Sequence, residues 1–556
     1  MIRTSCISIA LSSLLALSGC GGSSGGGSPP VPPAPPPPPP PVSSAEAFQL
    51  LNQATFGATE TETQTVVTLS VETWVDAELA KPPSLQLPHM QSLPPPQFLF
   101  ELQPDRVDIW FRNAVNGDDQ LRQRVAFALS EILVVSQQGA LVSFPFALAD
   151  YYDVLARNAF ANYRDLLEEV TLHPAMGIYL SMLGNEKPNA ALNIRPDENY
   201  ARELMQLFSI GLVQLNIDGT QVRDAQNQPI PTYDQAVIEG FAHVFTGWHF
   251  AGAPSFEFAA PTPTNRTQPM QLYDDFHDTG EKLLLDGVVL PAGQTGDQDL
   301  AAALDNIFNH PNVGPFIAFR LIQRLVTSNP SPSYVARVAT VFNDNGQGVR
   351  GDLGAVVKAI LLDEEARPSL PMDLDGKIKE PLLRVTQLWR AYGGRSQSGR
   401  YQLLQGIPPS IFLGQGPLQS PSVFNFFSPS YAPPGEISNS NLLAPELEIA
   451  TEYQNTLVTN YMFYQAFSAN SVSSEEPSFS DDDVFIDITD ELSVAGDTDA
   501  LIDLVAAKLL GGSISDVLRQ EIAGMLTLFS GPDSAPLRVA EAIYLVASSP
   551  EYAYQR

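Results

Sequence analysis

Cysteine is almost absent from this chain of 556 residues. Its two cysteines, Cys6 and Cys20, both lie within the first 20 positions. A folded domain that begins after them has no disulfide, no thiol nucleophile, no iron–sulfur cluster and no cysteine zinc site. Any chemistry in that domain therefore uses other side chains.

Positive charge is also scarce. The chain has 30 Lys and Arg against 62 Asp and Glu, which gives a formal net charge of −32. This field repels polyanions, so the sequence predicts no nucleic-acid partner and no unassisted binding to an anionic lipid surface. Because 44% of the residues are hydrophobic and 17% are charged, the chain has enough apolar material for a large core.

The N-terminus has the layout of a secretory signal. Arg3 is followed by an apolar run, Ile7 to Leu17, that is too short to span a membrane stably. The end of this segment, Leu17-Ser18-Gly19-Cys20, resembles the lipobox of bacterial lipoproteins, in which cleavage leaves an acylated cysteine as the new N-terminus. The alternative is an ordinary signal peptide cut near Gly19, with Cys20 as a free thiol.

The lipobox resemblance predicts a location. It implies a signal peptide over residues 1–20 and stable membrane contact through several acyl chains on Cys20. Gly21 rather than Asp follows the cysteine, which by resemblance to lipoprotein sorting implies the outer membrane. The expected location is the bacterial cell envelope, with the domain periplasmic or surface-exposed.

Residues 21–42 form a low-complexity tether. Gly21 to Ser28 contains only glycine and serine, and 11 of the 13 residues from Pro29 to Pro41 are proline. A proline run of this length is a stiff spacer of roughly 40 Å. Binding to proline-recognition domains is the alternative, but those partners are mostly intracellular.

Helical periodicity dominates from Ser43 onward and predicts a mainly α, multi-helical globular domain over residues 43–556. The clearest predicted helices are Asp118 to Ser136, Asn312 to Thr327, Ser331 to Phe342, Asp352 to Leu362, Lys377 to Tyr392 and Leu537 to Ala547. A few short β-hairpins are also expected. Asp286-Gly287 between apolar triplets predicts one over Leu283 to Leu290, and Leu212 to Ile230 is a weaker candidate.

An acidic stretch lies within this domain. Between Tyr401 and Ala507 there is no lysine or arginine and there are 15 acidic residues. The segment Asn470 to Glu491, which contains Asp481-Asp482-Asp483, predicts an exposed acidic loop. A calcium site is the alternative, although the EF-hand spacing and its central glycine are absent.

The predicted helix Asn199 to Leu212 carries a carboxylate on its apolar side. At 100° per residue, Glu203 falls inside the arc formed by the apolar residues. A carboxyl group there is either a general acid with a raised pKa or part of a structural ion pair. Glu198 and Arg202 lie on the opposite face with i, i+4 spacing, which predicts an exposed ion pair.

Two histidines follow on neighbouring segments. His243 lies at the edge of the apolar face of a predicted helix, Tyr233 to Trp248, whose start has the capping-box spacing of Thr232 and Gln235. It is either a proton-transfer group or a satisfied boundary histidine. His277 and Asp278 lie on a polar loop that ends at Lys282. They could ligate a divalent metal, but no third ligand is evident, and the alternative is turn chemistry plus an ion pair from Lys282.

Several known catalytic signatures are missing. There is no G-x-S-x-G, H-E-x-x-H or P-loop motif. Gly346 to Gly351 fits G-x-G-x-x-G, but a helix precedes it, so it predicts a turn between helices with Asp352 capping the second. No cofactor is evident apart from a possible divalent metal.

Many segments together resemble the bacterial family called domain of unknown function 1800. They are AFQLLNQATFGAT at Ala47, LRQRVAFALSEILV at Leu121, ENYARELMQLFSIGL at Glu198, FAHVFTGW at Phe241, FHDTGEK at Phe276, NHPNVGPFIAFRLIQRLVTSNPSPSYVARVA at Asn309, RGDLGAVVKAILLDEEAR at Arg350, KEPLLRVTQLWRA at Lys379 and SPSVFNFFSPSYAPPG at Ser420. The resemblance implies an exported, mainly helical bacterial protein with no established activity. The family's pattern often has histidine where this chain has Phe208.

Two functions fit these observations. The first is a lipid-anchored binding or assembly module whose partner is an envelope protein or polymer. The second is an envelope hydrolase or metal-assisted enzyme whose candidate catalytic residues are Glu203, His243, His277, Asp278 and Lys282. The second function requires these distant segments to converge, because catalytic groups act within hydrogen-bond reach.

Overall fold

The computed structural model describes residues 42–367, 376–404, 406–472, 480–531 and 533–556. Val42–Arg556 forms one compact unit. The predicted signal peptide, the predicted acylation site Cys20 and the predicted tether up to Pro41 lie outside the described residues. No helix within the described ranges is long and apolar enough to cross a membrane.

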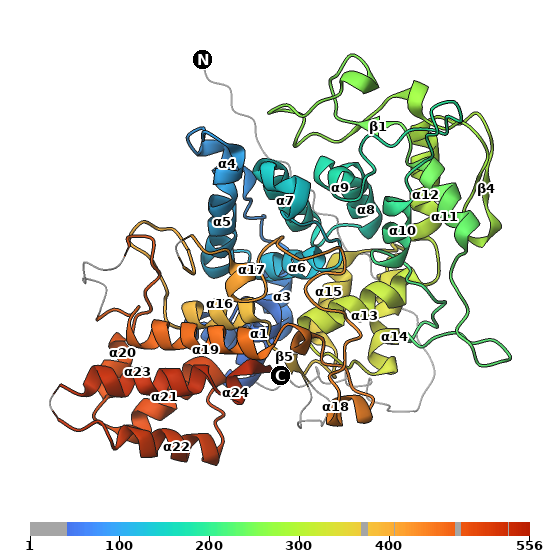
Figure 1. Ribbon diagram of the computed structural model, residues 1–556. Helices are drawn as coiled ribbons and strands as arrows, with labels where there is room; N and C mark the ends of the chain where they lie inside the picture. The colour runs from blue at the N-terminus through green and yellow to red at the C-terminus, as the bar shows by residue number, and fades with distance from the viewer. Residues whose placement is uncertain (1–41, 368–375, 405, 473–479, 532) are drawn as a thin grey trace, which may run out of the picture. The chain divides into compact units, whose positions relative to one another are not determined.

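The described residues contain 24 α-helices and three two-stranded antiparallel sheets, so the mainly α prediction is confirmed (Figure 1). The first third of the unit contains α1 (Ser44–Ala54), α2 (Glu60–Leu69), α3 (Val71–Leu79), α4 (Leu87–Ser92), α5 (Gln103–Asn116), α6 (Gln120–Ser130), α7 (Pro145–Asn158), α8 (Tyr163–Leu172) and α9 (Pro174–Tyr179).

The middle third adds helices and two of the small sheets. Its helices are α10 (Asn199–Gln206), α11 (Gln235–Val244), α12 (Gly296–Phe308), α13 (Val313–Leu325), α14 (Pro332–Asn343) and α15 (Leu353–Leu362). Its strands are β1 (Trp248–His249), which pairs with β2 (Gln271–Leu272), and β3 (Lys282–Leu283), which pairs with β4 (Val289–Leu290).

The last third returns to the first. It contains β5 (Lys377–Ile378), α16 (Pro381–Ala391), α17 (Pro409–Phe412), α18 (Glu436–Asn439), η6 (Pro445–Glu448), α19 (Glu452–Phe467), α20 (Thr489–Val494), α21 (Thr498–Leu510), α22 (Asp516–Leu526), α23 (Ala535–Ala547), α24 (Pro550–Ala553) and β6 (Tyr554–Gln555). Short 3₁₀ turns connect other elements at η1 (Leu99–Leu102), η2 (Gly139–Ser143), η3 (Phe256–Phe258), η4 (Asp274–Phe276) and η5 (Leu285–Gly287). β6 pairs with β5 and lies against α1.

A continuous hydrophobic core runs through the unit from Ala47 to Tyr552. Helix α16 packs on α5, α13 packs on α6, and α1 contacts α15. Because early and late helices share this core, side chains that are far apart in sequence meet inside it.

Four predicted helices match α13, α14, α15 and α23 to within two residues at each end. Asp352 caps α15 as expected, since its side chain accepts a hydrogen bond from the Ala355 amide. Two others are shorter than predicted. The helix over Asp118 to Ser136 ends as α6 at Ser130, because the chain turns at Glu131 and the apolar run that follows is buried without being helical.

The helix over Lys377 to Tyr392 begins only at Pro381. Proline favours the first turn of a helix and drives the residue before it into an extended conformation. Glu380 is therefore extended, and Lys377 and Ile378 pair with β6 as a strand instead of continuing the helix.

The helices that carry the candidate residues are also shorter than predicted. Asn199 to Leu212 ends as α10 at Gln206, after which the Ile210 amide bonds to the Met205 carbonyl in a wider turn. The predicted cap at Thr232 is wrong. Asp234 caps α11 through the Val237 amide, while the Thr232 hydroxyl bonds to the Gly211 carbonyl.

Both hairpin predictions are confirmed in outline. Asp286 and Gly287 have φ values of 57° and 72°, the positive pair that the turn between β3 and β4 requires. Over Leu212 to Ile230 the structure has isolated antiparallel bridges rather than full strands, for example Leu215 with Gln221 and Arg223 with Pro229.

The prediction of an exposed loop over Asn470 to Glu491 is wrong for part of the segment. Phe485 is buried and bridges Arg395, and Ile486 is buried and bridges Asn470. Glu491 is buried too and pairs with Lys508 at 2.8 Å. Cations that flank the acidic stretch therefore reach into it, which a count along the sequence does not reveal.

Helix α11 lies unusually close to β3. A Cβ atom on Gly240 would fall 1.8 Å from the Leu283 carbonyl oxygen. We expect Gly240→Ala to lower the free energy of unfolding by about 1 to 3 kcal/mol, because overpacking forces this backbone contact apart. Urea denaturation measures the change.

The control for this prediction is Gly524→Ala. Gly524 lies within α22 and has open space around the position of its missing Cβ. The same substitution there should stabilise the protein by up to about 1 kcal/mol through helix propensity. Equal effects at both positions would show that the contact between α11 and β3 is not tight.

Candidate functional site

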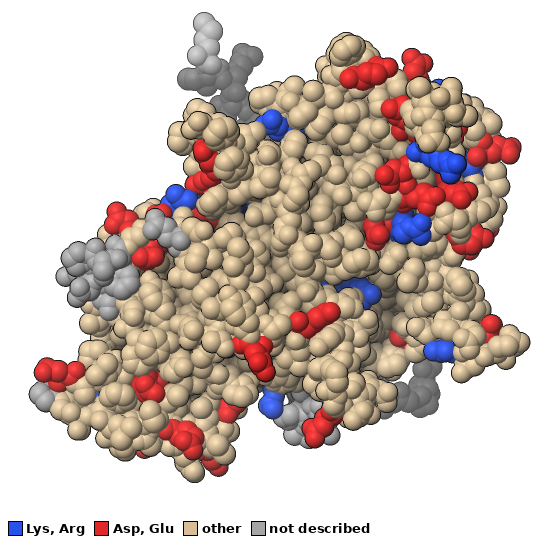
Figure 2. Space-filling model, viewed as in Figure 1, with Lys and Arg blue, Asp and Glu red and all other residues tan. Residues whose placement is uncertain are grey.

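Four of the five candidate catalytic residues meet where α11 ends against the loop before β3. His243 Nδ1 donates a hydrogen bond to Asp278 Oδ2. The two side chains are 33% and 18% exposed, respectively, so the pair lies at the surface. Figure 2 shows acidic and basic side chains gathered over the region of α10 and α11, on the right of the view.

Behind this pair, three buried side chains hold the loop in place. They are His277, Lys282 and Asp299, and we call them the buried latch. Asp299 on α12 is fully buried, and its Oδ2 lies 2.6 Å from Lys282 Nζ and 3.0 Å from His277 Nε2. Lys282 also donates to the carbonyls of Asp278 and Gly280. A buried ammonium with these acceptors fixes both ends of the turn that presents Asp278.

Thr246 joins the latch to the helix. Its hydroxyl donates to the His243 carbonyl at 2.7 Å and accepts from the Asp278 amide at 2.9 Å. Its carbonyl oxygen lies 3.0 Å from His277 Nδ1. Through these contacts the backbone of His243 and the backbone of Asp278 are tied together before their side chains meet.

The electrostatics favour an ionised Asp278. Burial raises the pKa of Asp278, but the Gly280 amide and His243 outweigh burial and hold that pKa below its usual value. An ionised carboxylate only accepts hydrogen bonds, so His243 Nδ1 is the donor in the pair. In the neutral form of the imidazole, the other ring nitrogen, Nε2, is then the acceptor.

Glu203 does not join this site. It is buried on α10 as predicted, and burial raises its pKa, partly opposed by the charge of Arg202. Burial together with the charge of Glu203 raises the pKa of Tyr233 to about 12. Among the described residues, no hydrogen bond or ion pair links Glu203 to the two histidines or to Asp278.

The ion pair predicted on the opposite face of α10 is present. Arg202 donates to Glu198 Oε2 at 2.9 Å, and both side chains are partly exposed. Gln235 at the start of α11 also donates to Glu198. This pair therefore helps to join α10 to α11.

Metal ligation is not supported at these residues. In the part of the chain that the structure describes, no group of three or more His, Cys, Asp and Glu side chains is arranged to hold a metal ion. The imidazole of His277 faces Asp299 and Thr246, whereas the carboxylate of Asp278 faces His243. The two adjacent residues thus point toward different partners.

Comparison with known proteins identifies a family. Residues 49–554 match the model of the family described as protein of unknown function (DUF1800). The chain belongs to the DUF1800 family. Neither the curated proteins nor the solved structures give a match.

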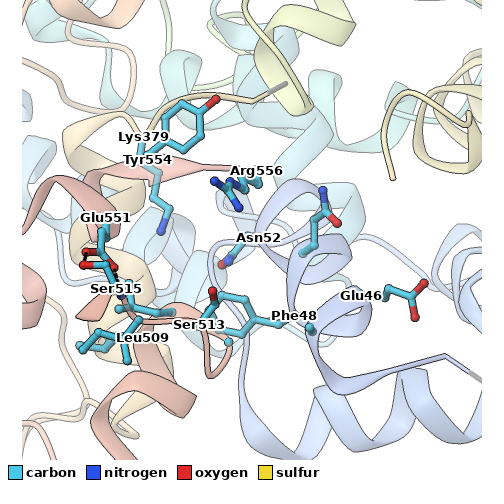
Figure 3. A pocket seen from close by; sticks show the side chains of 15 residues that line it. Glu46, Phe48, Asn52, Lys379, Leu509, Ser513, Ser515, Glu551, Tyr554 and Arg556 are labelled. Carbon is cyan, nitrogen blue, oxygen red and sulfur yellow. Dashed lines mark hydrogen bonds between the residues drawn. The ribbon is translucent and has the colours of Figure 1, made fainter. Parts of the chain in front are cut away.

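The DUF1800 domain also has a pocket near β5 that the sequence did not predict (Figure 3). The pocket has a volume of about 590 Å³ and lies between α1, the end of β5, the turn from α21 to α22, and α24. Lys379 lines it and is only 5% exposed. In the sequence, Lys379 at the start of KEPLL resembles an ordinary surface lysine, and only the fold reveals that it is buried.

A third feature of the DUF1800 domain is a buried charge cluster, formed by Glu131, Arg324, Lys377, Glu380 and Glu446. Lys377 Nζ lies 3.1 Å from both Glu380 and Glu446, and Arg324 lies 3.5 Å from Glu131. The Gln415 amide donates to both Glu131 and Glu380.

In the buried charge cluster, the pKa values of the Glu131 and Glu380 carboxyl groups are shifted in opposite directions. Burial raises the pKa of Glu131, and the charge of Glu380 adds to this effect. Burial acts in the same direction on Glu380, but Lys377 and the nearby arginines hold the pKa of Glu380 well below its usual value. The cluster joins α6, α13, β5 and η6.

Proposed function

We propose that this DUF1800 protein is an exported, lipid-anchored enzyme of the bacterial envelope that uses His243 as a general base. The contact that carries the proposal is the hydrogen bond from His243 Nδ1 to Asp278, made at the surface by a loop that is latched from behind. Lys282, His277 and Asp299 act as positioning residues.

This arrangement suits proton transfer. Asp278 orients the imidazole and stabilises the imidazolium that forms when Nε2 takes a proton. Hydrolysis is the simplest reaction of this kind, because a general base and a water molecule are sufficient. The proposed substrate class is an ester, amide, glycosidic or phosphoester bond of an envelope component.

The test uses the full-length protein with a panel of chromogenic esters, anilides, glycosides and phosphoesters. We expect hydrolysis of at least one bond class, and a fall of about 10² to 10⁴-fold in both His243→Asn and Asp278→Asn. His89→Asn, which alters another partly buried histidine on α4, serves as the control and should keep the full rate.

The competing proposal is a binding or assembly module without chemistry. It predicts that no substrate in the panel is hydrolysed and that an envelope protein or polymer co-purifies equally with wild type, His243→Asn and Asp278→Asn. Hydrolysis that survives His243→Asn would also exclude His243 as the base.

Membrane attachment is tested separately at the N-terminus. We expect wild type to sediment with the outer membrane and Cys20→Ala to be released into the soluble fraction, because the acyl chains are the proposed anchor. Fractionation followed by immunoblotting measures this. A Cys20→Ala protein that is exported and still sediments with membranes contradicts the lipoprotein proposal, and Cys6→Ala is the matched control.

A further inference from the structure

The pocket at Lys379 has apolar walls and a polar end. Phe48 on α1 and Leu509, Leu510 and Ile514 around the end of α21 supply the apolar part. Asn52 and Ser513 add polar groups. Figure 3 shows the side chain of Lys379 reaching down so that its amine points into the space between Asn52 and Glu551.

Lys379 has neutral partners. Its Nζ donates to the Gln387 side-chain oxygen at 2.6 Å and lies 4.6 Å from the centre of the Tyr552 ring. Within the described ranges, no carboxylate lies at ion-pair distance from this ammonium. Lys377, two residues earlier, pairs with two carboxylates, so the two lysines occupy opposite electrostatic environments.

The acidic residues of the pocket are engaged elsewhere. Glu46 accepts hydrogen bonds from the backbone and hydroxyl of Ser43 in a capping box. Glu551 accepts hydrogen bonds from the backbone and hydroxyl of Ser515. Neither carboxylate is therefore committed to the amine, which is buried with no counter-charge.

An amine in this setting loses its proton easily. Burial lowers the pKa of Lys379 to about 7, and the positive charge of Arg384 adds to the effect. At neutral pH roughly half of such a group is the free amine, against about one part in 2,500 for a lysine with an ordinary pKa of about 10.4. The free amine is the nucleophilic form.

We propose that the pocket is a carbonyl-binding site in which Lys379 forms an imine with an aldehyde or ketone ligand that has an apolar body. The free amine nitrogen bonds to the carbonyl carbon, the C=O double bond becomes a single bond, and one proton passes from the nitrogen to the oxygen to give a carbinolamine. Loss of the nitrogen proton and of the hydroxyl group, as water, then gives the C=N bond. The reaction needs no oxidant, reductant or metal, and water returns to the solvent.

The probe is benzaldehyde with sodium cyanoborohydride at about pH 7, followed by peptide mass spectrometry of the folded full-length protein. The hydride reduces any imine to a stable benzyl amine, so each lysine is read separately, and the chain has only seven. We expect Lys379 to be benzylated at least about 10-fold faster than the partly exposed Lys358, because its free-amine fraction is larger.

A matched pair of variants tests whether the pocket matters. Ser513 lines the pocket, and Ser513→Trp should slow benzylation of Lys379 by about 10-fold without changing Lys358. Val517→Trp, an exposed position on α22 that does not line the pocket, should leave both rates unchanged. Lys379→Arg should abolish the modified peptide.

Three results would overturn the proposal. They are benzylation of Lys379 no faster than that of Lys358, an equal effect of the two tryptophan variants, and a rate advantage for Lys379 that appears only after urea unfolds the protein. None of these measurements involves His243, so the proposed imine site and the proposed general base are tested independently of each other.

Discussion

Replacing Lys377 by methionine should lower the free energy of unfolding by about 3 to 5 kcal/mol. Lys377 is fully buried and lies 3.1 Å from each of two buried carboxylates, Glu380 and Glu446. Methionine has a similar length but no charge, so the substitution leaves two negative charges in the core without their shared cation. The cost is that of buried carboxylates that have lost their nearest cation, which exceeds the value of a surface ion pair.

Urea denaturation followed by circular dichroism measures this change. Lys358→Met is the matched control, since Lys358 also pairs with two carboxylates, Glu72 and Asp76, but does so at the surface. We expect the control to change stability by less than about 1 kcal/mol. Similar losses in the two variants would mean that the buried charge cluster is hydrated in solution.

The second large effect is a pH dependence that Lys379 introduces. We expect wild type to gain about 2 to 3 kcal/mol of stability relative to Lys379→Met when the pH rises from about 6 to about 9. Burial lowers the pKa of Lys379 to about 7 in the folded protein, whereas an unfolded lysine titrates near 10.4.

The sign follows from proton counting. Between these two pKa values the unfolded chain holds more protons on Lys379 than the folded chain does, so raising the pH favours folding. The cost of burying Lys379 is complete below about pH 7 and disappears above about pH 10.4. Methionine carries no proton, so the variant lacks this contribution.

The measurement is the difference in unfolding free energy between wild type and Lys379→Met at the two pH values. Lys358→Met again provides the comparison, because ion pairs at the surface raise the pKa of Lys358 instead of lowering it. Its difference from wild type should stay nearly constant over this range. If the difference for Lys379→Met is also constant, the folded protein does not lower the pKa of Lys379.

Local patterns predicted much of the fold. The apolar periodicity of α13, α14, α15 and α23 marked helices whose one face enters the core, and Asp286-Gly287 marked a turn that only certain residues adopt. Such features depend on neighbours in sequence. Where a local rule failed, a proline or a more distant partner decided the outcome, as at Pro381 and at Thr232, whose hydroxyl bonds to the Gly211 carbonyl.

The candidate site was only partly predictable. His243, His277, Asp278 and Lys282 were recognised as polar residues on adjacent segments, but Asp299 was missed because a single aspartate near the start of an amphipathic helix looks exposed. Glu203 was placed correctly on the buried face of α10, yet nothing in its helix position could show which segment faces it. Lys379 and the buried charge cluster depend entirely on packing between distant segments.

The buried charge cluster also orders the events of folding. Glu131 shares the amide of Gln415, 284 positions later, and Lys377 needs Glu446 from η6. A charge that loses its water before its partner arrives costs several kcal/mol, so we expect the centre of the domain to stay hydrated until this late segment docks. Because long loops must close before these pairs form, we expect folding to be slow. We also expect the domain to complete its core late, so that shorter nascent chains have an open and hydrated centre.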